Sequence, residues 1–355
     1  MKAIIRPSKV SGTISAPPSK SYTHRAIIIA SLADGTSVIR SPLISQDTIA
    51  TVEACRKLGV KIAIGKNYLI ITGTNGHLPK RKSPINIFCG LSGTTMRLMT
   101  AVAALAQNKV VIDGEKRLHE RPMNDLLTAL RKSRINIRSV NDNDQLPICI
   151  NGGEFRGGTI LVKGNLSSQF ISALLLISPF AKKDTTLVVE DLKSKPYVDI
   201  TIDMMKTFGV KVEKTGKIYK AKTGQKYKAR QYTVEGDYSS ASYLFAAAAI
   251  TGSRISVTNL NPTSVQGDKY FFEVLKKMKR HKLPQLDLDL GNHPDIVPTA
   301  AVMASTVSGK TVITNIKHLR TKESDRIKSI EEGLRNMHIK TSSNKDSLTI
   351  EGGTL

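Results

Sequence analysis

The sequence predicts an α/β protein of two domains, built from a repeated β-α-β-α-β-β motif. Three observations predict it: one pattern recurs five times along the 355 residues, most copies are evenly spaced, and several end in the same helix-to-strand junction. A chain of this length has room for about two domains. Helices that alternate with strands in this way cover the faces of β-sheets.

Each copy of the pattern starts with a small or polar cluster, continues with an apolar run typical of a helix, and ends in a β-branched strand. Anchored at Ser21, Thr94, Ser168, Ser240 and Ile296, the copies follow in steps of 73, 74, 72 and 56 residues. Such a regular spacing indicates internal repeats. The helical runs are residues 26–32, 98–106, 170–177, 243–250 and 300–304, and the strands are residues 37–39, 109–112, 186–189, 254–257 and 311–314.

A second helix follows in each repeat, and three repeats pass from it to a strand through similar residues. These junctions are residues 58–62, 208–212 and, in a looser form, 337–340. A glycine such as Gly59 or Gly209 suits the left-handed position that closes a helix. The alternation of apolar and other residues over 60–64 then predicts a half-buried strand.

Five repeats cannot be shared evenly between two domains, so we expect a sixth. A further step of 56 to 74 residues from Ile296 reaches residues 352–370, and the sequence ends at Leu355. We therefore expect the chain to hold five repeats of a six-repeat fold.

The composition is that of a soluble globular protein, with 40% apolar and 23% charged residues. Its apolar stretches are much shorter than the ~18 to 20 residues that span a bilayer. The N-terminal residues lack the apolar core of a secretory signal, so we expect a cytoplasmic protein with no membrane partner. Cys55, Cys89 and Cys149 are flanked by apolar residues, which is typical of buried reduced thiols.

The formal charge of +24 permits three interpretations: a nucleic-acid binder, a site for a highly anionic substrate, or a lysine-rich solvated surface. Nucleic-acid binders usually combine basic segments with stacking aromatic residues. This chain has no tryptophan and only 5% aromatic residues, so the first interpretation is disfavoured and we expect no nucleic-acid partner.

The first polar cluster, residues 16–25, has the strongest signal for a ligand site. Two prolines end a strand, Ser19 suits the helix N-cap, and Ser21 and Arg25 share one helix face with Lys20 at its start. A helix N-terminus with these side chains suits a phosphate or carboxylate. A capped helix with basic residues in solvent is an equally good explanation of this cluster alone.

The next clusters have the same design. Residues 93–97 offer a glycine for close backbone approach, two hydroxyls and an arginine for an anion. Residues 167–169 put two hydroxyls and an amide at a helix start, where simple capping is the stronger explanation. Arg121 precedes Pro122, which we expect in the first turn of a helix, and can face a ligand or solvent.

The fifth repeat supplies acidic residues. Asp295 lies at a helix start, where it can serve as a cap or as a functional carboxylate. Both charge signs crowd into residues 320–326, where Glu323 and Arg326 are spaced for an i,i+3 pair on a helix. A salt-bridged surface helix is the default explanation of this run.

Other chemistry finds little support in the sequence. The seven histidines make no metal-ligand spacing, so we expect no metal site. Residues 309–311 imitate the end of a phosphate-binding loop, but residue 304 is alanine where that loop needs glycine. The dinucleotide-binding and nucleophile-elbow motifs are absent too.

Taken together, the clusters resemble the enolpyruvyl transferases, and among them the branch that acts on shikimate 3-phosphate. The resemblance covers the whole sequence. Its motifs come in the family's order and approximate spacing, at residues 18–25, 92–97, 120–123, 167–170, 195–201 and 322–326. It implies an inside-out α/β barrel in each of two domains, one formed by residues 1–17 and 236–355 and the other by residues 18–235.

The resemblance also implies the reaction. The enolpyruvyl group of phosphoenolpyruvate would pass to the 5-hydroxyl of shikimate 3-phosphate, with release of phosphate, in the pathway to chorismate and the aromatic amino acids. No metal or organic cofactor is implied, and we expect a monomer. Asp295 would take the hydroxyl proton, and Glu323 and Lys20 would serve the protonation of carbon.

The motifs assign binding residues as well. For shikimate 3-phosphate they are Lys20, Ser21, Arg25, Ser167, Ser168, Gln169, Ser194, Tyr197, Asp295 and Lys322. For phosphoenolpyruvate they are Lys20, Gly93, Arg121, Gln169 and Arg326. Dense positive charge suits two phosphates and their carboxylates.

The sequence departs from the family pattern at Leu91, where asparagine is usual, and at His318, where some members have asparagine. The family's Asp-His-Arg helix and late lysine belong to the sixth repeat. Two alternatives follow: a form without that repeat that binds shikimate 3-phosphate but does not turn it over, and the sister enzyme that acts on UDP-N-acetylglucosamine. The sister enzyme typically has a reactive cysteine near residue 115, and residues 113–121 hold none.

Overall fold

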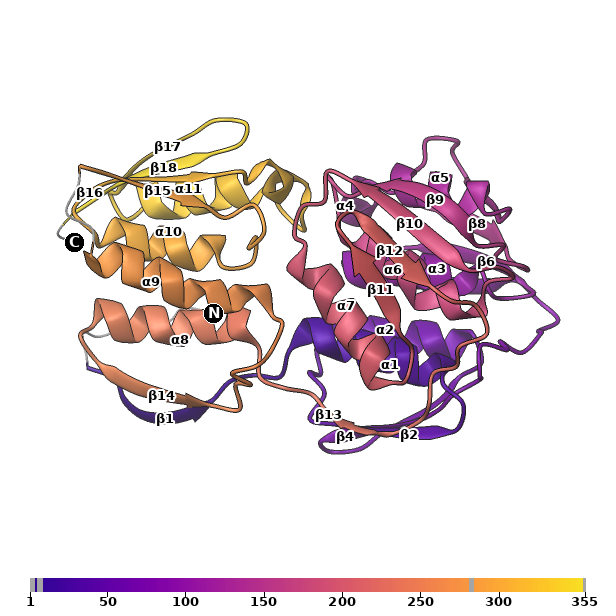
Figure 1. Cartoon of the computed structure of the whole chain (residues 1–355). Coiled ribbons are helices and arrows are strands. Elements are labelled where there is room, and N and C mark those ends of the chain that lie inside the picture. The colour runs from indigo at the N-terminus through magenta and orange to yellow at the C-terminus, as the bar shows by residue number, and fades with distance from the viewer. Residues whose placement is uncertain (1–3, 5–8, 281–283, 354–355) are drawn as a thin grey trace. The chain divides into compact units, whose positions relative to one another are not determined.

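The computed structural model describes residues 4, 9–280 and 284–353, and the chain separates into two compact units (Figure 1). Unit 1 is formed by Met1–Pro18, Glu235–Arg320 and Asp325–Leu355. Unit 2 is formed by Ser19–Val234 together with Thr321–Ser324. The short segment 321–324 therefore packs with unit 2, although its neighbours on both sides in the chain belong to unit 1.

Unit 2 holds three four-stranded sheets with one shared strand order. In each, a leading strand pairs in parallel with a second strand, which pairs antiparallel with the last strand of a β-hairpin. The sheets are β13(Gln231–Thr233)-β2(Thr36–Arg40)-β4(Tyr68–Thr72)-β3(Lys61–Ile64), β5(Ile85–Phe88)-β6(Lys109–Asp113)-β8(Ile148–Asn151)-β7(Asn136–Ser139) and β9(Gly158–Lys163)-β10(Thr185–Glu190)-β12(Ile218–Ala221)-β11(Val212–Thr215).

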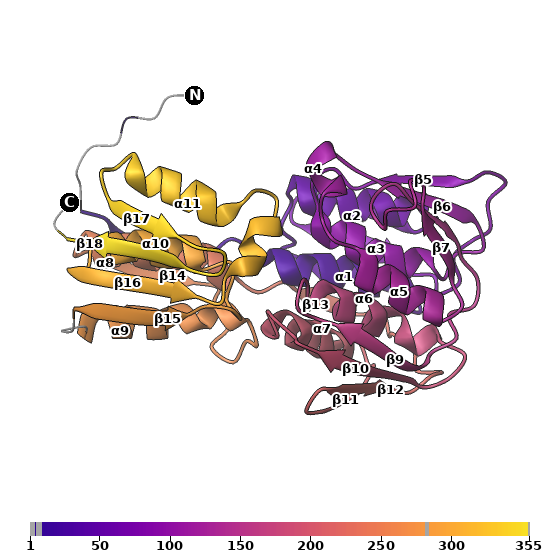
Figure 2. The ribbon, with the colours of Figure 1, turned by 90° about the horizontal axis from the view of Figure 1, so that it is seen from above.

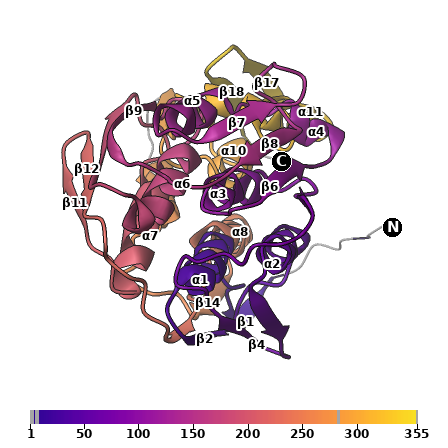
Figure 3. The same cartoon turned by 90° about the vertical axis from the view of Figure 1, so that its right-hand side faces the viewer.

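The helices of unit 2 form its core. The first helix of each repeat is buried almost all round, and Figure 3 shows α1, α3 and α6 between the sheets that carry β2, β6 and β12. A helix that is apolar on every side is stable only in such an interior. The helices are α1(Lys20–Leu32), α2(Gln46–Lys57), α3(Gly93–Ala103), α4(Lys116–His119), α5(Asn124–Lys132), α6(Gln169–Ile177), η1(Ser178–Phe180) and α7(Pro196–Thr207).

Unit 1 repeats the design in one complete sheet and one shorter sheet. The complete sheet is β15(Gln285–Asp289)-β16(Gly309–Thr314)-β18(Leu348–Gly352)-β17(Lys340–Ser343), and Figure 2 shows β15, β16 and β18 side by side. The shorter sheet pairs β1(Ser11–Ser15) with β14(Arg254–Thr258) in parallel. The helices are α8(Tyr238–Ile250), η2(Gly267–Tyr270), α9(Phe271–Arg280), α10(Val297–Ser305), η3(Lys317–Thr321) and α11(Arg326–Arg335).

The predicted repeats are confirmed, and the structure explains the short step of 56 residues. In the three repeats of unit 2 and in the β15 repeat, the second helix is followed by a β-hairpin. In the repeat of α8 and β14, only four residues separate the end of α9 at Arg280 from the start of β15 at Gln285. Four residues are too few for two strands and their turn, so this repeat is shorter, and its described residues include no hairpin.

The predicted helix closures are also confirmed at Gly59 and Gly209, whose φ angles are 97° and 92°. The other two complete repeats use Arg134 and His338 at the same position, with φ of 66° and 61°. A side chain at positive φ is strained by about 1 kcal/mol or more. The four repeats therefore keep the backbone conformation even where the glycine is replaced.

Two local predictions need correction. Residues 322–325 are not helical, because the short helix η3 ends at Thr321 and α11 begins only at Arg326, with Asp325 as its N-cap. Pro122 lies outside the first turn of α5, which starts at Asn124. Ser19 occupies the N-cap position of α1 as expected, but its hydroxyl makes no capping hydrogen bond. The three cysteines are buried free thiols, as predicted.

Candidate functional site

Arg25 lies at the centre of a buried network that joins α1 to α7. Its Nε donates to Thr201 Oγ1 at 2.7 Å, and its terminal nitrogens donate to the backbone oxygens of Ser21 at 2.9 Å and Tyr197 at 2.8 Å. Only 2% of Arg25 is exposed, and this burial lowers its pKa to about 10. The guanidinium thus holds the start of α7 against the first polar cluster. The predicted site residue Tyr197 lies at this start of α7 and is partly buried.

Arg97, Gln169 and Thr94 form a second polar group between α3 and α6. Arg97 donates to Gln169 Oε1 at 2.9 Å, and Gln169 Nε2 donates to Thr94 Oγ1 at 2.9 Å. Arg97 also stacks over the ring of Phe170 at 5.4 Å. Burial and the charge of Arg121 lower the pKa of Arg97 well below its usual value, while Glu323 opposes that shift. The amide of Gln169 therefore has a fixed orientation.

Arg121 and Glu323 bring two predicted site residues together within unit 2. Arg121 is 4% exposed, and one of its terminal nitrogens donates to Glu323 Oε1 at 3.0 Å, while the Glu323 side chain is 41% exposed. Residues 321–324 pack with unit 2, and this ion pair is one contact that holds them there.

Gly93 is required beside the Arg121 guanidinium. A Cβ atom built at Gly93 would lie 2.1 Å from the Arg121 Nη1 atom and 2.3 Å from its Cζ. This is far inside van der Waals contact, so any side chain here displaces the guanidinium. The glycine that we expected to allow close approach to a ligand also lets Arg121 approach closely.

The remaining predicted residues of unit 2 lie at helix starts or in nearby loops. Lys20 begins α1, next to the partly buried Ser21, and its Nζ lies 3.3 Å from Asp47 Oδ2. Ser168 is the N-cap of α6, and Ser167 Oγ accepts a hydrogen bond from the backbone N–H of Gln169 at 3.3 Å. The buried Ser194 precedes α7 with a φ of 53°, and Lys322 lies partly buried in segment 321–324.

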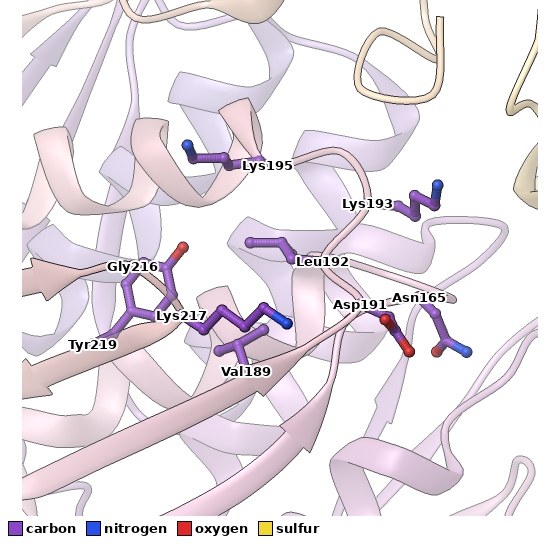
Figure 4. A pocket seen from close by; sticks show the side chains of 9 residues that line it. All are labelled: Asn165, Val189, Asp191, Leu192, Lys193, Lys195, Gly216, Lys217 and Tyr219. Carbon is purple, nitrogen blue, oxygen red and sulfur yellow. The ribbon is translucent and has the colours of Figure 1, made fainter. Parts of the chain in front are cut away.

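A hollow of about 550 Å³ lies beside the Ser194 loop (Figure 4). Lys193, Lys195 and Lys217 line it, together with one carboxylate, Asp191, and with the ring of Tyr219. Figure 4 shows the Lys217 side chain extending from the turn between β11 and β12. Because the lysines outnumber the carboxylate, the surroundings of Ser194 favour anions.

In unit 1, the structure pairs Asp295 with Arg326. A terminal nitrogen of Arg326 donates to Asp295 Oδ1 at 2.6 Å, and both side chains are partly buried. Asp295 precedes α10 but is not its cap, since the N-cap is Ile296. Asp325 instead caps α11 and pairs with Arg320 at 3.0 Å. Glu323, for which we expected an i,i+3 partner in Arg326, contacts Arg121.

Sequence reasoning missed three residues that organise these groups. Arg97 belongs to a motif that we recognised but was not among the predicted site residues. Thr201 likewise belongs to the recognised motif 195–201 but was not a predicted site residue. Asp47 gave no signal, because its contact with Lys20 joins residues that are 27 positions apart. Membership of a recognised motif was the usable signal for Arg97 and Thr201, and the burial of Arg97 shows why it needs partners.

The two departures from the family pattern lie in different settings. Leu91 is 47% exposed and lines a hollow with Asp47, Gly90 and Lys116, so an apolar side chain faces a polar surface there. His318 is buried within the short helix η3.

Two general findings concern only the residues that the structure describes. None of their helices is long and apolar enough to cross a membrane. No group of three or more histidine, cysteine or acidic residues among them is arranged to hold a metal ion.

The sequence matches the family described as EPSP synthase (3-phosphoshikimate 1-carboxyvinyltransferase) over residues 4–355. The chain belongs to the EPSP synthase family. A 3-phosphoshikimate 1-carboxyvinyltransferase of Methanobrevibacter smithii is 42% identical over 98% of this chain and 85% of its own length. One of Methanococcoides burtonii is 42% identical over 100% of this chain and 86% of its own.

The fold comparison agrees with this assignment. A solved EPSP synthase from Acinetobacter baumannii superposes on this chain with a TM-score of 0.80 and 26% sequence identity. The superposition covers 98% of this chain and 83% of the Acinetobacter baumannii chain. The predicted enolpyruvyl transferase fold is therefore confirmed. The EPSP synthase family consists of transferases of the shikimate pathway, as the motifs indicated.

Proposed function

We propose that this chain transfers the enolpyruvyl group of phosphoenolpyruvate to shikimate 3-phosphate, the reaction for which its family is named. One observation carries the proposal beyond family membership: unit 2 buries Arg25, Arg97 and Arg121, which are 2%, 3% and 4% exposed. Burying a guanidinium is costly even where hydrogen bonds and ion pairs offset part of the cost, so three buried arginines suggest a use for fixed positive charge. Two phosphorylated substrates that also carry carboxylates need such charge in their binding sites.

We assign the substrates to the residues named by the motifs. The shikimate 3-phosphate residues are Lys20, Ser21, Arg25, Ser167, Ser168, Gln169, Ser194, Tyr197, Asp295 and Lys322. The phosphoenolpyruvate residues are Lys20, Gly93, Arg121, Gln169 and Arg326. The fixed amide of Gln169 and the lysine-lined hollow beside Ser194 support the unit 2 part of this assignment. Because Arg25 already donates to four protein oxygens, we propose that it also positions Tyr197.

The reaction needs one base and one acid. A hydroxyl of shikimate 3-phosphate attacks the central carbon of phosphoenolpyruvate while the methylene carbon gains a proton, and phosphate leaves in a second step. We propose that Asp295 takes the hydroxyl proton. Glu323 and Lys20 would deliver the proton to carbon and remove it again when phosphate departs.

The ion pairs suggest how the carboxylates become available. Arg121 pairs with Glu323, and Arg326 pairs with Asp295, so each arginine proposed to bind phosphoenolpyruvate contacts a carboxylate proposed to move a proton. A substrate phosphate or carboxylate competes with the protein carboxylate for the same guanidinium. Binding of phosphoenolpyruvate would thus weaken both pairs and leave Glu323 and Asp295 able to exchange protons.

The test is the exchange of each carboxylate for its amide. Glu323→Gln and Asp295→Asn should each reduce phosphate release at least about 10³-fold, with little change in shikimate 3-phosphate affinity measured by calorimetry. Glu53→Gln is the matched control, because Glu53 forms an exposed pair with Arg56 at 2.7 Å on α2. Normal turnover in either site variant would refute the assigned role.

A pair of assays separates the related reaction. Phosphate release from phosphoenolpyruvate should require shikimate 3-phosphate and should not occur with UDP-N-acetylglucosamine. The same assay on the 355-residue chain distinguishes an active enzyme from a form that only binds shikimate 3-phosphate.

We further propose that the chain acts as a monomer in the cytoplasm. The charge of +24 supports a monomer, because two such chains repel one another. Sedimentation at physiological salt measures the mass directly.

A further inference from the structure

In the part of the chain that the structure describes, the sheet formed by β1 and β14 lacks the hairpin that completes each of the other four sheets. In those sheets the second strand has the leading strand on one side and the last hairpin strand on the other. β14 is the second strand of its repeat, and among the described residues β1 is the one strand paired with it. The outer edge of β14 therefore offers backbone donors and acceptors where the other repeats have an antiparallel partner.

The neighbouring repeat shows what such a partner looks like. In β14, Arg254 lies opposite Ser11, the first residue of the leading strand β1. In β16 of the complete sheet, Lys310 lies opposite Gln285, the first residue of the leading strand β15, so Lys310 corresponds to Arg254. Lys310 lies opposite Glu351 of β18 in the antiparallel pairing. A carboxylate thus faces the cation at this position in the complete sheet of unit 1.

Apolar positions also correspond between the two strands. In the β18 register, Ile350 would face Ile255 and Leu348 would face Val257, both of which are only half-buried in β14. Apolar cross-strand pairs of this kind each stabilise a sheet by roughly 0.2–1 kcal/mol.

A hollow of about 550 Å³ lies beside this strand. It is lined by Phe245 and Ala249 of α8, Leu275 and Lys279 of α9, and Arg254 and Ile255 of β14. In the complete sheet of unit 1 the second helix, α11, packs on the hairpin strand β17. The hollow next to α9 therefore corresponds to the place that a hairpin strand occupies in the neighbouring repeat.

We propose that the outer edge of β14 binds an extended segment of a partner protein as an antiparallel strand. The segment carries apolar residues at alternate positions and a carboxylate opposite Arg254. Addition of a strand to a sheet edge takes its affinity from backbone hydrogen bonds and its specificity from alternate side chains. Arg254 and Lys279 are the charged residues that line the hollow, so its charge selects an acidic strand.

A second copy of this chain fits the edge less well. Its own β14 would bring another Arg254 and another chain of +24 charge, and it would supply no carboxylate to this edge. Self-pairing is thus an outcome that the experiment must detect.

The test uses the chain's own β18 as a probe peptide. A fluorescent peptide with the sequence of residues 346–353, Asp-Ser-Leu-Thr-Ile-Glu-Gly-Gly, is titrated with the full chain at low salt and followed by anisotropy. A second peptide carries E351K. The wild-type chain should bind the glutamate peptide at least about threefold more tightly than the lysine peptide, and R254E should reverse this order.

The matched control is K109E. Lys109 begins β6 as Arg254 begins β14, but it lies opposite Asn151 of β8, so its sheet edge is already covered. K109E should leave the peptide preference unchanged. Hydrogen exchange should show that bound peptide protects residues 254–258, which locates the contact independently of any variant.

Three results would overturn the proposal. The first is no binding of either peptide, the second is an equal loss of preference in K109E and R254E, and the third is a dimer in sedimentation that R254E dissociates. None of these measurements depends on enzymatic turnover, so the proposal can fail while the proposed reaction holds.

Discussion

Replacing Gly93 with alanine tests whether Arg121 must stay where the structure puts it. The new Cβ would lie 2.1 Å from Arg121 Nη1, and ordinary contact begins near 3.4 Å, so the guanidinium must move by more than 1 Å. A misplacement of about 1 Å can cost roughly 100-fold in rate, and one hydrogen bond to a charged group contributes about 1.5–3 kcal/mol. We therefore expect kcat/KM for phosphoenolpyruvate to fall about 10- to 100-fold.

The assay measures phosphate release while each substrate is varied in turn. The KM for shikimate 3-phosphate should change little, because Gly93 is assigned to the phosphoenolpyruvate site. Gly333→Ala is the control, since a Cβ at Gly333 in α11 meets no atom within 4 Å. A folded Gly93→Ala variant with an unchanged KM for phosphoenolpyruvate would show that Arg121 does not bind that substrate.

Three further variants test the packing. Burial lowers the pKa of His24 well below 6.5, so His24 stays neutral in the folded protein while it gains a proton in the unfolded chain below pH 6.5. The free energy of unfolding should therefore fall by up to about 1.4 kcal/mol per pH unit below pH 6.5. In His24→Asn, the free energies of unfolding measured in urea at pH 5 and pH 7 should differ less. Arg25→Lys should lower the free energy of unfolding by about 2–4 kcal/mol, because buried acceptors lose their donor. His338→Gly should raise the free energy of unfolding, measured in urea titrations, by about 0.5–1 kcal/mol, because glycine adopts a positive φ without strain. An unchanged free energy of unfolding would show that His338 is not strained.

The repeat pattern predicted most of the fold because each helix and strand depends on local sequence. The helical runs and strands of all five repeats appear at the expected places. What the pattern could not provide is the pairing of strands that are distant in sequence. The strand just before the first cluster, β1, pairs with β14, and the sheet of β2 takes its leading strand from β13.

The sequence suggested which residue types form the candidate site but not the contacts among them. Motifs predicted Lys20 and Gln169 at helix starts and Arg121 between α4 and α5, because the chemistry of anion binding limits the side chains that serve it. The charge run at 320–326 suggested a salt-bridged helix. The helix was wrong, because α11 begins only at Arg326, whereas the run does hold one ion pair, between Arg320 and Asp325. Glu323 contacts Arg121, 202 residues earlier in the chain, and no spacing rule within a segment can predict such a contact.

The late arrival of β13 has a consequence for synthesis of the chain. Gln231 lies opposite Val38, so the first sheet of unit 2 stays open at one edge until some 190 further residues have left the ribosome. The strand β1 stays unpaired for still longer, because Ser11 lies opposite Arg254. Pairing across such separations is slow, because the entropy of closing the loop is lost before the contacts form. The first-made strands are thus exposed for longest, and refolding from denaturant should be limited by closure of these two sheets.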